Sequence, residues 1–196
     1  RSTKTCRGRK GYCWYRISRG WNRRPSRAKK TCKYEKAYAD EEKAKQIAKE
    51  FIGEERINQL NSNGLVENGN IQVFDFNVTL NDGNENNPLT ISISKKGGHI
   101  VNMNYNRDIE AEVISQEEAN EIGKNFLDSR EISNMEATYY LKEQGVARVN
   151  YAYEQEGVTV YPDLIKLKIA LDNGEILGIE TTGYLNNHTQ RNIGKP

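Results

Sequence analysis

The body of this chain lacks cysteine, because Cys6, Cys13 and Cys32 all lie within the first 33 of its 196 residues. Their spacing fits no common zinc motif, and an odd number of cysteines does not imply a closed set of disulfides. No apolar run approaches the roughly 20 residues that a membrane-spanning helix needs. No charged-then-apolar signal peptide opens the sequence as given. These absences predict a soluble polypeptide without a structural zinc site.

Acidic residues are missing from the start of the chain. Residues 1–33 contain thirteen Lys and Arg and no Asp or Glu, whereas the remaining residues carry 16 basic and all 27 acidic side chains. The body therefore has a net charge of −11. Such a charge argues against nucleic acid or an anionic membrane as the partner of the body.

The basic segment at residues 1–36 shows no helical or strand periodicity, and it holds both tryptophans, Trp14 and Trp21. One interpretation is a nucleic-acid arm, in which cations bind phosphates and aromatic rings stack on bases. Another is a disordered tail or an expression artefact, since this composition buries too little apolar area to order itself. A third is a changed reading frame, because the composition shifts abruptly near Lys33. We expect a disordered or non-native segment.

Catalytic motifs are also missing. The two histidines are His99, beside a Gly-Gly turn, and His188, in a polar tail, and we expect both to be exposed. No motif of the serine hydrolases, zinc peptidases, P-loop or dinucleotide-binding proteins occurs. Asp82, Asn84 and Asn86 alternate as in a calcium loop, but the rest of that pattern is absent. We therefore predict no enzyme, and no catalytic, cofactor-binding or metal-binding residue.

What the body does contain is an internal repeat. The segment ADEEKAKQIAKEFIG, from Ala39, is similar to SQEEANEIGKNFLDS, from Ser115, with Glu42 matching Glu117 at an offset of 75 residues. Later, ISISKKGGHIVNM is similar to IKLKIALDNGEILGI at an offset of 76 residues. The near-constant offset means that the two copies share element lengths. We place the copies at residues 37–110 and 111–193.

Each copy is predicted to begin with an amphipathic helix, because its apolar residues recur at the spacing of one helical face. Asp40 can cap the first helix, and Ser115 with Glu118 can form a capping box for the second. The small residues Ala48 and Gly123 let each helix approach its partner surface closely. The two stripes are Ala44, Ile47, Ala48, Phe51 and Ile52, and Ala119, Ile122, Gly123, Phe126 and Leu127.

After each helix the period falls to two, which is typical of strands with one buried face. Residues 95–98 and the Asn173-Gly174 pair predict hairpin turns. The polar segments 61–70 and 81–88 predict loops. Sheets with one wet face are antiparallel, and a helix covers the apolar face. The sequence predicts an α+β fold of two tandem modules, each a helix packed on a three- to four-stranded antiparallel sheet.

Tyrosine is abundant in the second copy. We expect Tyr151 and Tyr153 to pack under the helix. The run Tyr161, Pro162 and Asp163 breaks the strand pattern, and tyrosine is common at protein interfaces. These three residues are our candidates for binding a protein partner.

Two sets of residues carry a family resemblance. The tandem helices, each followed by strands that close on a Gly-x-Ile-Val type of ending, resemble PepSY domains. The strings YPDLIK, ALDNGEILG and GYLNNH, together with the rest of about residues 37–193, resemble the C-terminal region of the YpeB germination-protein family. That family also has an N-terminal membrane-anchoring helix and a larger N-terminal region, in place of the basic segment found here.

The resemblance implies a non-enzymatic spore protein, lodged near the inner membrane and cortex, outside the cytoplasm of the spore core. It implies that the chain binds the cortex-lytic enzyme SleB and stabilises, localises or restrains it. Membrane contact would come only from an N-terminal anchor that is absent from the sequence given, and a homo-oligomer stays open. The alternative is a general peptidase-inhibitor module, like the PepSY units of metallopeptidase propeptides. No catalytic residue comes with the family.

Overall fold

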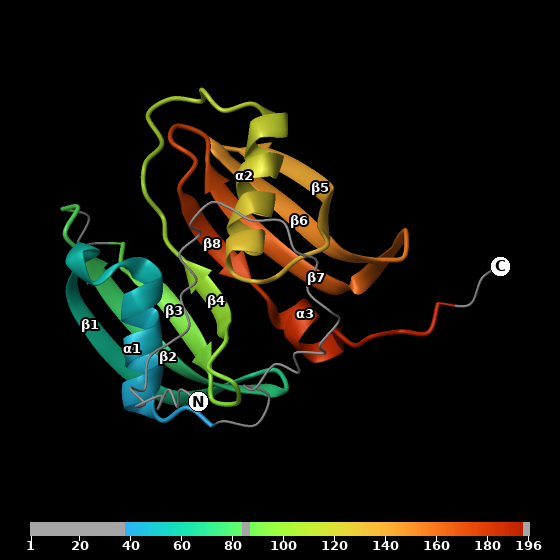
Figure 1. The fold of residues 1–196 in the computed structure, drawn as a ribbon. Coiled ribbons are helices and arrows are strands. Elements are labelled where there is room, and N and C mark those ends of the chain that lie inside the picture. The colour runs from blue at the N-terminus through green and yellow to red at the C-terminus, as the bar shows by residue number, and fades with distance from the viewer. Residues whose placement is uncertain (1–37, 84–86, 194–196) are drawn as a thin grey trace, which may run out of the picture. The chain divides into compact units, whose positions relative to one another are not determined.

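The computed structural model describes residues 38–83 and 87–193, which belong to one structural unit. The expectation for residues 1–36 lies outside the described residues. The first half contains α1 (Glu41–Ile52), a short 3-10 turn (Glu54–Arg56), β1 (Ile57–Asn68), β2 (Ile71–Leu80), β3 (Leu89–Ser94) and β4 (Ile100–Asn104). The second contains α2 (Gln116–Ser129), β5 (Met135–Glu143), β6 (Val146–Gln155), β7 (Val158–Ala170), β8 (Ile176–Glu180) and α3 (Thr182–Asn187) (Figure 1).

The predicted start signals of both long helices are confirmed. The Asp40 carboxylate accepts a hydrogen bond of 2.8 Å from the backbone amide of Lys43. Ser115 and Glu118 form the reciprocal capping box, with bonds of 3.2 Å and 2.9 Å between side chain and backbone. These bonds satisfy amides that the first turn of a helix leaves without partners.

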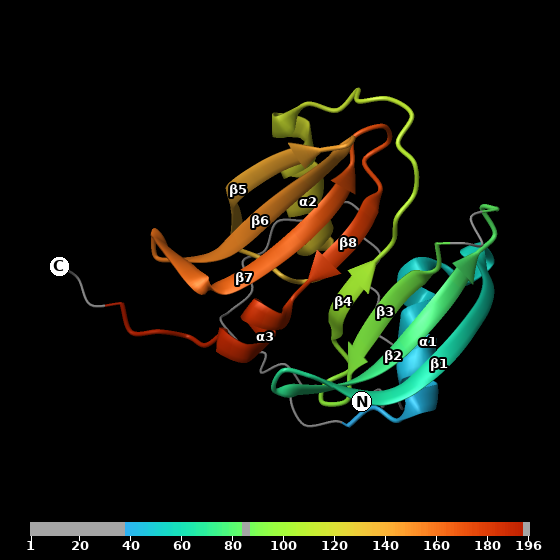
Figure 2. The same ribbon diagram turned by 180° about the vertical axis from the view of Figure 1, so that it is seen from behind.

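The strands form one eight-stranded antiparallel sheet in the order β1-β2-β3-β4-β8-β7-β6-β5. Helix α1 covers the strands of the first half, and α2 covers those of the second, on the same face of the sheet (Figure 1). The view from behind shows the strands in front of both helices (Figure 2). The predicted α+β class, with helices packed on antiparallel strands, is confirmed.

The two halves meet where β4 pairs with β8, a contact that the sequence did not predict. Met103 lies opposite Ile179, with Asn102 opposite Glu180 and Asn104 opposite Gly178. Since the repeat offset here is 76 residues, Ile179 is the repeat equivalent of Met103. Strand β4 therefore pairs with β8, which is its equivalent in the second repeat. The two strands are related by a local two-fold axis between Met103 and Ile179.

The same local symmetry relates the helices. Phe51 of α1 and Phe126 of α2 are repeat equivalents, and their ring centroids lie 6.2 Å apart in an edge-to-face arrangement. This geometry is favourable for aromatic pairs. The two halves are thus joined both within the sheet and above it. Their assignment as separate domains stays a prediction.

The prediction of a polar loop at residues 61–70 is wrong. Strand β1 extends to Asn68 and pairs with β2 along its length, and only Gly69 and Asn70 form the turn. Most side chains of β1 are exposed, so the strand lacks the alternation that reveals a half-buried strand. Its polar side chains instead bond across the ladder, as Asn63 does to Asp75 at 2.9 Å. The described residues of 81–88 lie outside the strands, as predicted.

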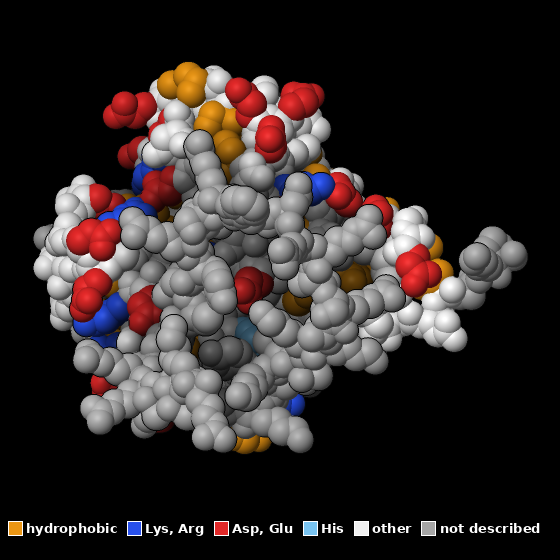
Figure 3. Space-filling view, in the orientation of Figure 1, with side chains coloured by type: hydrophobic (Ala, Val, Ile, Leu, Met, Phe, Trp, Pro, Cys, Tyr) orange, Lys and Arg blue, Asp and Glu red, His pale blue; other side chains and the backbone are white. Residues whose placement is uncertain are grey.

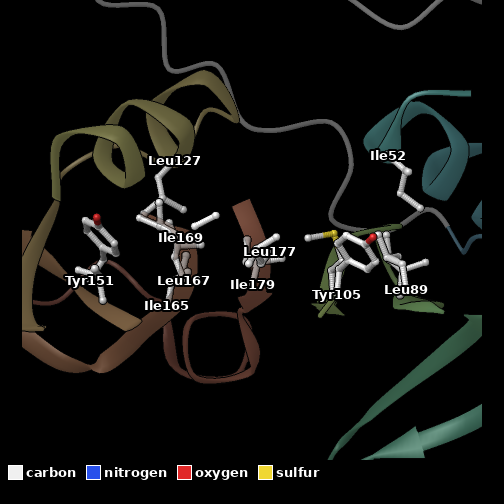
Figure 4. Packing of buried hydrophobic residues seen from close by; sticks show 14 of the residues in the cluster. Ile52, Leu89, Tyr105, Leu127, Tyr151, Ile165, Leu167, Ile169, Leu177 and Ile179 are labelled. Carbon is white, nitrogen blue, oxygen red and sulfur yellow. The ribbon is translucent and has the colours of Figure 1, made fainter. Parts of the chain in front are cut away.

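The core lies between the helices and the sheet, as Figure 4 shows for residues from both halves. Tyr151 is fully buried beneath α2, as predicted, whereas Tyr153, 8% exposed, packs against His188. The Tyr151 hydroxyl donates a 2.9 Å hydrogen bond to the backbone carbonyl of Asn120 in α2. A Cβ atom on Gly123 would lie 2.7 Å from Cζ of Tyr151 and closer still to its oxygen. The close approach of α2 to the sheet therefore requires glycine at this position.

Candidate partner-binding surface

No group of three or more His, Cys, Asp and Glu side chains that could hold a metal ion occurs among the described residues. No helix in the described part of the chain is long and apolar enough to cross a membrane. Acidic side chains gather around α2 on the visible part of the helical face (Figure 3).

The candidate residues Tyr161, Pro162 and Asp163 lie inside β7, where they form a bulge. Ala152 pairs with Leu164, but the next residue of β6, Tyr153, pairs with Val160. The three residues between have no partner on β6. Tyr161 is 65% exposed and Pro162 is also exposed, so both can contact a partner.

Asp163 is fully buried, and this corrects its prediction as a contact residue. Its carboxylate binds the guanidinium of Arg191 through two bonds of 2.6 and 2.7 Å. Nδ1 of His188 lies 2.9 Å from the same carboxylate. We call Asp163, His188 and Arg191 the tail clasp, because they fasten the segment after α3 to the bulge of β7.

His188 is not the exposed tail residue that the sequence predicts. Its side chain is 30% exposed and lies between two tyrosines. It stacks on Tyr184 with ring centroids 4.3 Å apart and meets the ring of Tyr153 edge to face at 4.6 Å. The imidazole is therefore held in place on both sides.

Further polar contacts fix the tail and α3 to the bulge. The amide of Gln155 donates to the backbone carbonyl of Arg191 at 2.6 Å and accepts from its backbone amide at 3.1 Å. Asn187 donates to the carbonyl of Pro162 at 3.0 Å. A Cβ on Gly183 would lie 3.0 Å from the carbonyl of Leu164, so this glycine permits the close packing of α3.

Sequence reasoning missed the roles of Gln155 and Arg191, because 28 residues separate Arg191 from Asp163. The available signal was the pair of strings YPDLIK and GYLNNH. The structure brings these two strings together. Asn187 bonds to Pro162, His188 bonds to Asp163, and Gly183 lies close to the same bulge. Strings singled out by resemblance thus form one packed unit.

The charge on Asp163 is stabilised in the folded state. Burial tends to raise the pKa of its carboxyl, but hydrogen bonds from Arg191 and His188 outweigh that effect and hold the pKa below its ordinary value of 3.8. A carboxyl with a lowered folded-state pKa contributes stability above its unfolded pKa. That contribution is lost as the pH falls through the folded pKa.

We therefore expect the urea midpoint of unfolding to fall as the pH drops below about 4, the unfolded-state pKa of an aspartate. An Asp163→Asn variant, which cannot titrate there, should show a shallower dependence below that pH. Equilibrium unfolding by circular dichroism between about pH 2.5 and 7 measures both slopes. Equal slopes for the two proteins would show that other carboxyls account for acid sensitivity.

Comparison with known proteins identifies the family of the chain. A family model described as "YpeB sporulation, PepSY1 and PepSY2 domains" matches residues 21–194. The sporulation protein YpeB of Oceanobacillus iheyensis is 31% identical over 121 residues, which are 62% of this chain and 27% of that protein. The sporulation protein YpeB of Halalkalibacterium halodurans is 28% identical over 162 residues, which are 83% of this chain and 35% of that protein.

A solved structure described as the Bacillus megaterium YpeB C-terminal domain is also similar. It has a TM-score of 0.72 and 25% sequence identity, and the match covers 81% of this chain and 70% of that one. The chain spans about a third of the length of the curated relatives it matches. Since the family model covers most of its residues, this chain belongs to the YpeB family of sporulation proteins, and the match spans the family's PepSY1 and PepSY2 domains.

Proposed function

We propose that this chain is a non-enzymatic spore germination protein that binds the cortex-lytic enzyme SleB and stabilises, localises or restrains it. In this proposal it acts in the spore, outside the cytoplasm of the core. Membership of a sporulation family supports the setting. The germination role and the enzyme partner come from the family resemblance of the strings that form the bulge and the tail.

The observation that carries the proposal is the exposed side chain of Tyr161 on the bulge of β7, whose backbone is held by the bonds of Asp163. Tyr161 is 65% exposed, and the nearby Asp163 is anchored by Arg191 and His188. A tyrosine on an ordered backbone supplies a large contact area at a low cost in entropy. The bulge is therefore a preorganised contact surface for a protein partner.

The direct test is association of the full chain with purified SleB-type enzyme, measured by calorimetry. We expect binding, and Tyr161→Ala should weaken it about 10-fold, as for a central interface aromatic. Tyr139→Ala is the matched control, because Tyr139 is 53% exposed but lies on β5. Absence of association at about 50 μM would contradict the proposal, because such a complex would be weaker than most specific ones.

A second candidate function is that of a general peptidase inhibitor of the PepSY type. The observation that favours it is the outer edge of β5, which pairs with no further strand of the described residues and where Tyr139 and Leu141 are 53% and 42% exposed. An edge strand can pair with an extended segment of another protein. This function predicts dose-dependent inhibition of a metallopeptidase and no effect on cortex-lytic enzymes.

A further inference from the structure

We propose that the cleft between the C-terminal halves of α1 and α2 binds an acidic peptide segment with a large apolar side chain beside its carboxylate. This site is separate from the bulge of β7. The proposal does not depend on the identity of the enzyme partner.

The cleft is a hollow with mixed apolar and charged lining beside the pair of rings Phe51 and Phe126. It has a volume of about 160 Å³. Its lining includes Phe51 and Ile52 of α1, Phe126 of α2, and Leu89 and Met103 of the sheet. An apolar cavity of about 150 Å³ holds a benzene molecule, so this hollow suits one aromatic or large aliphatic side chain.

Arg130 lines this hollow and packs against its two aromatic rings. Arg130, the residue that ends α2, places its guanidinium carbon 4.4 Å from the ring centroid of Phe51 and 5.4 Å from that of Phe126. Arg130 is an exposed residue, desolvation of its guanidinium lowers its pKa, and no carboxylate of the described residues forms a salt bridge with it. The carbonyl end of α2 and the two rings offset its charge only in part.

The carboxylate on the other side of the cleft is already neutralised. Glu175 accepts bonds from Arg56 at 2.5 Å and from Arg107 at 3.0 Å. Arg107 also forms two bonds with Asp172, at 2.7 and 2.8 Å. The charged residues that line the cleft are Arg56, Arg130 and Glu175, and of the two arginines Arg130 is the one without a salt bridge among the described residues.

These observations specify the ligand's chemistry. The exposed guanidinium of Arg130 has no carboxylate partner among the described residues, and a ligand carboxylate can form two parallel hydrogen bonds with it. The adjacent hollow favours an apolar side chain, because filling it removes apolar surface from water. A positively charged side chain placed directly against Arg130 is disfavoured, because it would meet an arginine without a salt bridge. The occupant that fits is thus a segment such as Phe-Glu or Leu-Asp on another polypeptide.

The test uses the full chain and two capped peptides, acetyl-Gly-Phe-Glu-Gly-amide and its Phe-Gln counterpart. We expect the glutamate peptide to bind more tightly and to shift the NMR signals of Phe51 and Phe126. Arg130→Gln should weaken the glutamate peptide about 10-fold, the value of one charged hydrogen bond, and leave the glutamine peptide unchanged. Arg148→Gln is the matched control, since Arg148 lies on β6 away from the cleft.

Equal affinity for the two peptides, or signal shifts confined to other regions, would overturn the site. Arg130→Lys keeps the charge and should retain part of the preference, which separates loss of charge from loss of folding. A change in sedimentation on Arg130→Gln would instead assign the cleft to a second copy of the chain, and so overturn the peptide proposal. Association with the SleB-type enzyme is measured separately, so failure of the peptides leaves that result intact.

Discussion

Replacing Arg191 by alanine should lower the free energy of unfolding by about 3 kcal/mol, because a buried carboxylate would lose its main partner. Asp163 would keep the hydrogen bond with His188 at 2.9 Å. Removal of one partner of a buried ion pair usually costs about 3–5 kcal/mol. We take the low end of this range, since the Arg191 side chain is 32% exposed and water can partly replace it. Urea unfolding at about pH 7, where the carboxylate is charged, measures the change.

The matched control for this change is Arg148→Ala. Arg148 lies 3.5 Å from Glu143, and both side chains are more than half exposed. Such pairs contribute less than about 1 kcal/mol, so this variant should remain close to the parent in stability. If Arg191→Ala lowered the free energy of unfolding no more than Arg148→Ala does, the bonds of Arg191 with Asp163 would not hold the tail in place. Faster proteolysis near residue 188 with unchanged global unfolding would show that the loss is local to the tail.

Gly123→Ala should destabilise the protein by about 2 kcal/mol, even though alanine is the better helix former. The new Cβ would overlap the Tyr151 ring, with Cζ only 2.7 Å away, and α2 would have to move from the sheet. The propensity gain of about 1 kcal/mol opposes this cost but does not exceed it. Thermal and urea unfolding give the size of the difference.

A double-mutant cycle with Tyr151→Phe separates the clash from other effects of alanine. Removing the hydroxyl removes the atom nearest to the new Cβ, although it also loses the hydrogen bond to Asn120. Gly123→Ala should therefore cost about 1 kcal/mol less when it is combined with Tyr151→Phe than when it is made alone. The exposed helix position Asn125, replaced by alanine, is a control that should be neutral or stabilising. Additive effects at positions 123 and 151 would refute the proposed overlap.

The features predicted correctly from the sequence are local or periodic. The caps at Asp40 and Ser115 depend on residues three apart, and the helical stripes repeat at a fixed spacing. The Asn173-Gly174 turn forms because Gly174 adopts a positive φ of 77° that glycine accepts readily. Signals of this kind are contained within a few consecutive residues.

The features missed depend on distant contacts or on exposure. Strand β1 is an edge strand with few buried side chains, so its pattern is that of a polar loop. The pairing of Met103 with Ile179 and the clasp of Asp163 by Arg191 join residues far apart in the sequence. Tyr161 and Pro162 are exposed, but Asp163 is buried, because a buried aspartate beside a proline has the same sequence signal as an exposed turn.

The pairing of β4 with β8 has a consequence for how this protein responds to dilution. Two separate copies joined through equivalent strands would dissociate at low concentration, as any homodimer does. Placing both copies on one polypeptide keeps the effective concentration of each for the other high. It also covers an edge that a lone copy would offer to its neighbours. The sheet therefore stays complete even when only a few molecules of the protein are present.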